Sequence, residues 1–318
     1  MLREVASGVE TGATETALSG ALRYGVQAGK IFCPVTAEVV VELTKQSPAN
    51  MAGTMMVIDL LSLGVAMVPH QERTAIEFHT LMTDAWPSCP PVDRPIWTAF
   101  AFAFGYEDLK PSVDGLTVDD ALICALADRA WQAPPSLLAS SLEQGMFQAR
   151  ECSEDSARRL NAQHALHAHE IDGFETAWRI ETRGACSLLE GIAQHEIERI
   201  AAAEGHDVDP NSHQTAQTLT QMVAAGLRDP ANRRRFGSLY VPAVIHAAIR
   251  AANRTVKAND IYDFQHAAAA LPYCRAFFTD GSLRTLICAG HTALDREYTC
   301  TVVSRPADAL AVLKDLCS

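Results

Sequence analysis

The sequence lacks the long apolar segments and paired cysteines that are typical of membrane and secreted proteins. No apolar run reaches transmembrane length, and the N-terminus has no signal-peptide-like apolar region. The nine cysteines stand singly and form no C-x-x-C pair, so neither zinc-site nor disulfide spacing is present. We therefore expect a cytoplasmic protein in a reducing compartment, with no membrane partner.

Basic charge is also scarce. The formal net charge of −12 argues against a general nucleic-acid coat protein, which would need a basic surface. A nuclease is still compatible with this charge, because its acidic site recruits metal while a small basic patch holds phosphate. We find no internal repeat and no low-complexity tract, and 48% hydrophobic residues predict a soluble globular protein.

No H-E-x-x-H motif accompanies the histidines, so a zinc-protease site is not indicated. His164, His167 and His169 lie close together on one predicted helix. His195 is followed directly by Glu196. We interpret these histidines as polar residues on helix surfaces, because the spacing of a metal site is incomplete.

The segment 257–287 has the most informative pattern. Asn259 or Asp260 can cap a helix that contains an alanine run and that Pro272 ends. Residues 276–279 predict a short buried strand, and Asp280 with Gly281 predicts a turn directly after it. Asp280 is thus expected beyond the carboxyl end of a strand, where open α/β sheets place their ligands.

Asp260, Asp263 and His266 are spaced three residues apart on the preceding helix, so neighbouring members of this series share a face. Together with Asp280 they predict converging carboxylates, which repel one another unless a hard divalent cation such as Mg²⁺ lies between them. A structural explanation stays open from spacing alone. In it, Asp260 and Asp263 belong to a helix cap, Asp280 is a turn residue, and His266 makes an ordinary hydrogen bond.

The strings D-x-x-D-x-x-H, LPYC and FFTD resemble the C-terminal half of PIN-like nucleases, especially large bacterial forms with helical insertions. The resemblance implies that Asp263 (or Asp260) and Asp280 belong to an acidic cluster that binds Mg²⁺ or Mn²⁺ and cuts RNA. Arg275 departs from the acidic residue expected after Pro-Tyr-Cys.

The string CPVTAEVVVELTKQ resembles the PIN-like helix whose glutamate joins the acidic cluster, and Glu42 is the matching residue. The resemblance thus implies Glu42, Asp263 and Asp280 as metal ligands, with Asp260 as a further ligand or water-orienting group. His266 would hold a ligand carboxylate. A solvated pair of Glu42 with Lys45 is the alternative.

By this resemblance the fold class is α/β. A PIN-like parallel sheet is built from both chain ends, using strands at residues 31–35, 276–279 and 298–303, around a large all-helical insertion. The expected domain parts are residues 1–80 and 240–318 for the PIN-like domain and residues 81–239 for the insertion. Apolar spacing predicts helices at 51–63, 118–132, 136–150, 153–204 with a break near Gly173 or Gly184, 212–227 and 306–316.

A basic region precedes the acidic segment. It comprises Arg228, Arg233, Arg234, Arg235, Arg250, Arg254 and Lys257. Its position predicts that Arg233, Arg234, Arg235 and Arg254 contact the phosphates of single-stranded RNA. A solvated helix edge is the other interpretation, and it applies to most such charge runs.

The expected function is a metal-dependent, possibly toxin-like ribonuclease that acts on single-stranded RNA. The alternative is a catalytically inactive PIN-like scaffold that acts as a binding or regulatory protein and contacts a protein partner through its helical insertion. A third possibility is a mainly helical scaffold unrelated to PIN domains.

The chain has no aspartate before Asp59, whereas PIN-like domains open with a strand that ends in one. Residues 1–5 resemble the helix that normally follows that strand. We therefore expect weak or absent nuclease activity for residues 1–318, even with Glu42, Asp263 and Asp280 in place.

Overall fold

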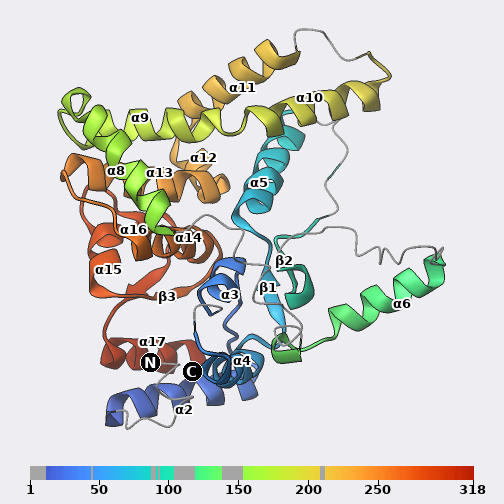
Figure 1. The fold of residues 1–318 in the computed structure, drawn as a ribbon, viewed down its shortest axis with the longest axis vertical. Coiled ribbons are helices and arrows are strands. Elements are labelled where there is room, and N and C mark those ends of the chain that lie inside the picture. Colours follow the sequence, from blue (N-terminus) through green and yellow to red (C-terminus); the bar gives the residue numbers. More distant parts are fainter. Residues whose placement is uncertain are drawn as a thin grey trace. The chain divides into compact units, whose positions relative to one another are not determined.

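The chain is built mainly from α-helices (Figure 1). The computed structural model describes residues 12–43, 46–86, 91, 94–103, 119–137, 153–207 and 212–318. These residues contain fifteen α-helices and two sheets of two strands each. The predicted α/β fold class, with a PIN-like parallel sheet built from both chain ends, is therefore wrong.

The predicted sheet fails mainly at its N-terminal strand. Of residues 31–35, only Val35 makes a β-contact, an isolated parallel bridge to Ala66. Pro34 contributes to this outcome, because proline has no N–H to donate to a strand ladder. The helix content matches the mainly helical architecture that was the third possibility, although two of the predicted strands do pair with each other.

The chain divides into two compact units. The first comprises residues 1–69, 96–150 and 305–318, and the second comprises residues 70–95 and 151–304. In the first unit the described elements are α2 (Ala13–Gln27), α3 (Ala37–Leu43), α4 (Pro48–Ser62), β1 (Val65–Met67), β2 (Trp97–Ala99), η1 (Phe100–Phe102), α6 (Asp120–Trp131) and α17 (Pro306–Cys317).

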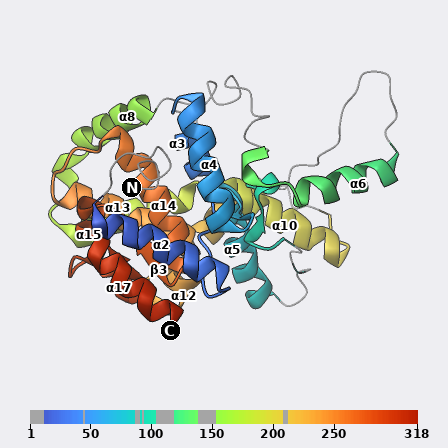
Figure 2. The same cartoon turned by 90° about the horizontal axis from the view of Figure 1, so that it is seen from below.

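Helix α2 packs against α17 in the first unit, and Figure 2 shows the two helices side by side. Helix α2 buries an apolar face made of Leu18, Leu22 and Val26, which recur at every fourth position. A Cβ atom at Gly25 would lie 2.8 Å from Cys317 Sγ and from Ile31, so the close approach of α17 depends on this glycine.

Strand β1 pairs antiparallel with β2 in the first unit, with Val65 opposite Ala99 and Met67 opposite Trp97. A small apolar core lies around this pair. Its buried members are Val35, Val40, Leu43, Met55, Ile58, Ala66, Phe100 and Ala103.

The second unit contains most of the helices. Its described elements are α5 (His70–Ala85), α8 (Ser153–Leu166), η3 (Ala168–Glu170), α9 (Phe174–Ser187), α10 (Glu190–Glu204), α11 (Ser212–Gly226), α12 (Pro230–Arg235), α13 (Gly237–Ala251), α14 (Ala258–Tyr273), β3 (Ala276–Phe278), α15 (Gly281–Cys288), α16 (Leu294–Glu297) and β4 (Thr301–Val303).

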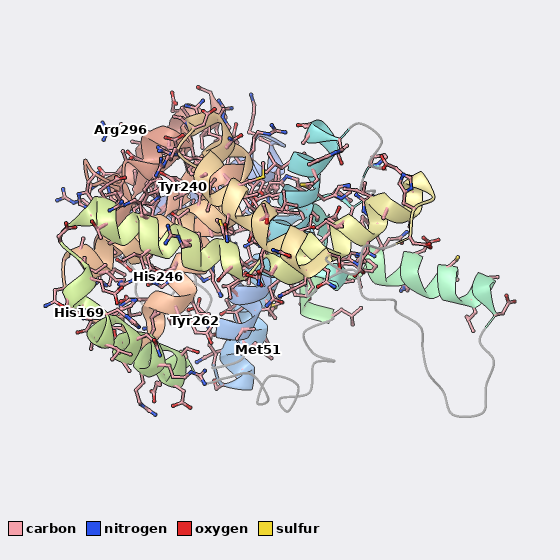
Figure 3. All side chains as sticks on the ribbon, turned by 90° about the horizontal axis from the view of Figure 1, so that it is seen from above. Met51, His169, Tyr240, His246, Tyr262 and Arg296 are labelled. Atoms are coloured by element: carbon pink, nitrogen blue, oxygen red, sulfur yellow. The ribbon has the colours of Figure 1, made fainter. Side chains whose placement is uncertain are left out.

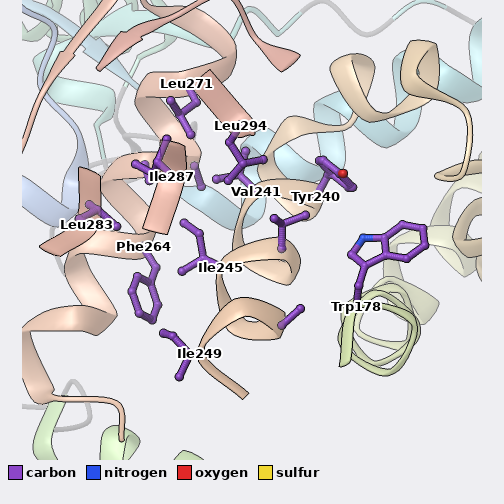
Figure 4. Packing of buried hydrophobic residues seen from close by; sticks show 14 of the residues in the cluster. Trp178, Tyr240, Val241, Ile245, Ile249, Phe264, Leu271, Leu283, Ile287 and Leu294 are labelled. Atoms are coloured by element: carbon purple, nitrogen blue, oxygen red, sulfur yellow. The ribbon is translucent and has the colours of Figure 1, made fainter. Parts of the chain in front are cut away.

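Helix α13 lies at the centre of the second unit. Eleven of its fifteen residues are buried, and it packs against α9 and α14. Figure 4 shows Val241, Ile245 and Ile249 of α13 directed toward the side chains of neighbouring helices. A helix that is apolar on nearly all sides is a core helix, and α5, α9, α12, α14 and α15 all contact it.

Strands β3 and β4 pair in parallel, with Ala276 opposite Thr301 and Phe278 opposite Val303. Helices α15 and α16 connect them, as a parallel pair requires. The predicted strands at 276–279 and 298–303 are confirmed in type, and their sheet consists of these two strands.

The predicted helices 118–132 and 212–227 are confirmed with small shifts over the residues that the structure describes. The predicted helix 153–204 is interrupted twice, at residues 167–173, as expected near Gly173, and again at residues 188–189 between α9 and α10. Of the predicted helix 136–150, residues 138–150 lie outside the described part of the chain. Among the helices that the structure describes, none has both the length and the apolar character needed to cross a bilayer.

Candidate functional site

The predicted acidic residues Asp260 and Asp280 both cap helices. Asp280 precedes α15, and its carboxylate accepts a hydrogen bond of 2.8 Å from the Leu283 amide. Asp260 accepts a bond of 3.0 Å from the Lys257 amide and forms an ion pair of 2.9 Å with Arg254. These contacts are those of the structural explanation considered for the same spacing.

The other predicted ligands are distributed over both units. Asp263 and His266 lie partly exposed on α14 in the second unit, whereas Glu42 lies on α3 in the first. Within the described ranges, no group of three or more His, Cys, Asp or Glu side chains is placed to hold a metal ion. The Mg²⁺ or Mn²⁺ site of Glu42, Asp263 and Asp280 stays a prediction.

The arginines expected to contact RNA take part in contacts within the chain. Arg234 lies 3.5 Å from Glu297, Arg235 forms an ion pair with Asp84, and Arg254 pairs with Asp260. Each of these pairs would compete with a phosphate for the same guanidinium group.

Arg233 has a structural position. Its guanidinium lies over the rings of Trp178 and Tyr240, at 5.5 and 5.3 Å from their centroids. It also donates hydrogen bonds to the carbonyl oxygens of Leu227 and Arg228, at 2.8 and 3.1 Å. Arg233 thus holds the segment that follows α11 against α9 and α13. Tyr240 of α13 is labelled in Figure 3.

A buried carboxylate joins three helices of the second unit. Glu77 of α5 is 5% exposed and accepts hydrogen bonds from the Ser238 amide, the Ser238 hydroxyl and the Tyr273 hydroxyl. Burial raises the pKa of Glu77 to about 7, while these hydrogen bonds and the nearby charge of Arg73 lower it. Because these hydrogen-bond donors belong to α13 and α14, which pack against α5, we interpret this cluster as structural.

A second buried polar contact joins α5 to α10. His79 Nδ1 lies 2.6 Å from Glu196 Oε2, and Arg199 Nη2 lies 2.7 Å from the same oxygen. Thr83 lies 3.2 Å from the other ring nitrogen of His79, but its hydroxyl also donates to the carbonyl of that residue. Glu196, which directly follows His195 in the sequence, is therefore buried and joins α5 to α10.

Among the three predicted surface histidines, His164 differs from the others. Its ring packs edge-on against His246 of α13, with 6.3 Å between centroids, whereas His167 and His169 are more exposed and contact Glu170. Burial lowers the pKa of His164, and it lowers that of His246 to about 4. A pKa of about 4 keeps the His246 ring neutral at pH 7.

A groove of about 600 Å³ lies between α9 and α11 in the second unit. This volume is within the range of small-ligand sites. Three arginines line it, Arg179 and Arg183 from α9 and Arg228 from the end of α11, together with a single carboxylate, Glu190. Among the described residues, none of these three guanidinium groups forms an ion pair.

The spacing of these cations is unfavourable in itself. Arg179 and Arg183 are four residues apart on one helix, and like charges at this spacing repel by about 0.2–0.5 kcal/mol. An anion between the two side chains would convert this repulsion into attraction. The groove is therefore suited to a negatively charged ligand.

The floor of the groove contains polar atoms without partners. Thr182 is 3% exposed and Trp178 is 7% exposed, and both line the groove. The Thr182 hydroxyl and the Trp178 indole N–H are buried, and neither has a hydrogen-bond partner among the described residues. Buried polar groups in folded proteins are nearly always paired, so a ligand or water is expected to supply the partners.

The sequence reasoning missed Trp178, Arg179 and Arg183. The available signal was the string AWRIETR, in which two arginines at helical i,i+4 spacing follow a tryptophan. Arg228 was noted only as part of the basic region. The packing of α11 on α9 brings it to the same groove, and helix pairing of this kind is not visible in local sequence.

Comparisons with known proteins give no relative for this chain: no family model, no curated protein and no solved structure matches it. The resemblance to PIN-like nucleases stays a prediction.

Proposed function

We propose that this chain is a binding protein for a phosphate-bearing ligand, a nucleotide that is free or part of a single-stranded RNA, in the groove between α9 and α11. The observation that supports the proposal is the set of Arg179, Arg183 and Arg228, three guanidinium groups around one groove that form no ion pair with a described residue. Guanidinium groups match phosphate oxygens in charge and geometry, and two N–H groups of one arginine can bind one phosphate.

This role shares only the absence of catalysis with the alternative expected from the sequence, a PIN-like scaffold that contacts a protein partner, because the ligand proposed here is a nucleotide. RNA as a partner is part of the proposal, because the groove is a local cationic site on a chain with a net charge of −12. Cleavage of RNA by Glu42, Asp263 and Asp280 with Mg²⁺ or Mn²⁺ stays a separate prediction, since those residues do not contribute to the groove.

A cytoplasmic location also belongs to the proposal. All seven cysteines that the structure describes are free, and this agrees with a reducing compartment. Nucleotides and RNA are abundant in that compartment.

The test is a binding measurement with two probes, 5′-AMP by calorimetry and a short labelled single-stranded RNA by fluorescence anisotropy. Hydrogen bonds to charged groups contribute about 1.5–3 kcal/mol each, so Arg183→Gln should weaken binding roughly tenfold or more. Arg158→Gln is the matched control, because Arg158 is an exposed arginine of α8 that is paired with Asp155 and does not line the groove.

Binding of AMP together with RNA supports a site for a single nucleotide, and binding of RNA alone supports a site that needs the continuous strand. In either case, Arg183→Gln must weaken binding and Arg158→Gln must leave it unchanged. The proposal is overturned if the wild-type protein binds neither probe, or if both variants bind as the wild type does.

A further inference from the structure

The charges of the α9–α11 groove are separated along its length. The Arg233 guanidinium, which lies over Trp178 and bonds to the Arg228 carbonyl, fixes the end of α11 beside the first part of α9. At the opposite end, Ser187 and Glu190 flank the junction of α9 and α10. Figure 1 shows α11 running back along α10 and α9, which is consistent with this orientation.

The cationic end thus contains Arg179 and Arg228, Arg183 lies midway along this part of α9, and the opposite end contains Glu190 and Gln217 of α11. Arg179 and Ser187 are eight residues apart on α9, which corresponds to about 12 Å along the helix axis. This length is comparable with the long axis of a nucleoside monophosphate.

Glu190 is the only carboxylate among the described residues that line the groove, and no ion pair with a described residue neutralises it. A carboxylate repels phosphate, so it cannot serve the anionic part of the ligand. It can accept hydrogen bonds from a donor group at the other end of the ligand. Gln217, with one acceptor oxygen and two donor hydrogens, can complete such a contact.

We infer that Glu190 recognises the base of a nucleotide bound in the groove. It favours bases whose edge carries hydrogen-bond donors, and guanine most of all. This inference rests on the proposed phosphate site at Arg179, Arg183 and Arg228. Guanine presents two adjacent donors, its ring N–H and its amino group, and the two oxygens of one carboxylate can accept both. Adenine and cytosine offer one amino group, whereas uracil has a single ring N–H between two carbonyl oxygens that a carboxylate repels.

The position of Glu190 also has a structural consequence. It is the first residue of α10, where a negative charge interacts favourably with the helix dipole. Glu190→Gln keeps the size and one acceptor oxygen of the side chain but lacks the charge. A change in stability alone would affect the binding of every nucleotide equally, so the ratio of affinities for two nucleotides isolates base recognition.

The experiment compares the affinities for 5′-GMP and 5′-UMP, with inorganic pyrophosphate as the probe without a base. For the wild-type protein we expect GMP to bind roughly tenfold more tightly than UMP, as a good bidentate contact to a base provides. In Glu190→Gln this ratio should fall to about threefold or less, while pyrophosphate binds at least as tightly as before. The amide introduced by the substitution can accept one hydrogen bond from either base and can also donate one to a carbonyl oxygen of uracil, so no large preference for GMP should remain.

The phosphate site and the recognition of the base can be contradicted separately. Equal binding of GMP and UMP by the wild-type protein, with Arg183→Gln still weakening both, overturns base reading and leaves the phosphate site intact. An unchanged GMP-to-UMP ratio in Glu190→Gln likewise overturns the role of Glu190. Absence of binding for GMP, UMP and pyrophosphate overturns the proposed function and the inference together.

Discussion

The pH dependence of stability should be controlled in large part by one buried side chain, Glu77. Burial raises its pKa from 4.5 to about 7 in the folded chain. A carboxyl group with a raised pKa binds its proton more tightly in the folded state than in the unfolded state. Its contribution to stability is therefore fully present below pH 4.5 and is lost as the pH rises through 7.

The magnitude follows from the size of the shift. Each pKa unit corresponds to 1.36 kcal/mol, so a shift of about 2.5 units gives a loss of about 3 kcal/mol between pH 4.5 and pH 8. Glu77 is 5% exposed, and screening by solvent reduces this value little. A loss of this size is a large part of the stability of an ordinary domain.

Glu77→Gln tests this expectation directly. The amide oxygen can still accept from the Ser238 amide, while the side chain no longer titrates. Urea unfolding at pH 4.5, 6, 7 and 8 should show the wild type losing about 3 kcal/mol relative to this variant. Glu175→Gln, an exposed position on α9, is the control and should follow the wild type. Parallel pH curves for the wild type and Glu77→Gln would refute the reasoning.

Three further changes probe contacts described above. Asp280→Ala should lower the unfolding free energy by about 1 kcal/mol, because it removes the cap of α15, whereas Asp280→Asn should lose little, and thermal denaturation compares the two. Arg233→Ala should lower the melting temperature more than Arg234→Ala. Arg233 donates hydrogen bonds to two carbonyl groups and packs over two aromatic rings, whereas Arg234 forms only a solvent-exposed ion pair with Glu297 among the described residues. Equal effects of the two substitutions would contradict this difference. Gly237→Ala should destabilise by about 1–3 kcal/mol in urea unfolding, because its Cβ would overlap the Pro272 ring, and a neutral result would contradict the close packing of α13 on α14.

Metal-dependent cleavage is testable with the same variants. If Asp280 is a ligand, Asp280→Asn should nearly abolish Mn²⁺-dependent cleavage of single-stranded RNA while preserving stability. Full cleavage by Asp280→Asn would remove the metal-site assignment of this residue, and its role would be that of the helix cap alone.

Local features of the fold were predictable from the sequence where one pattern decided the outcome. The short apolar run at residues 276–279 identified a strand, whereas the turn expected at Asp280 and Gly281 is the start of α15, which Asp280 caps. The interruption near Gly173 was likewise visible, because glycine and its polar neighbours break the helical spacing.

The global arrangement was not predictable, since it depends on which segments pair. Residues 31–35 have the apolar character of a strand, yet only Val35 makes a bridge, and its partner Ala66 lies in a different strand from the one expected. The groove could not be predicted for the same reason. Arg179 and Arg228 are 49 residues apart in the sequence (228 − 179), and only the packing of α11 on α9 places them in one site.

The proposed phosphate site is tested most directly by the salt dependence of RNA binding. For single strands, the logarithm of the affinity falls with the logarithm of salt concentration by about 0.7 for each phosphate neutralised. Anisotropy titrations at several salt concentrations should give a slope that is smaller by about 0.7 in Arg183→Gln than in the wild type, and unchanged in Arg158→Gln. The same slope for all three proteins would contradict a phosphate site in the α9–α11 groove.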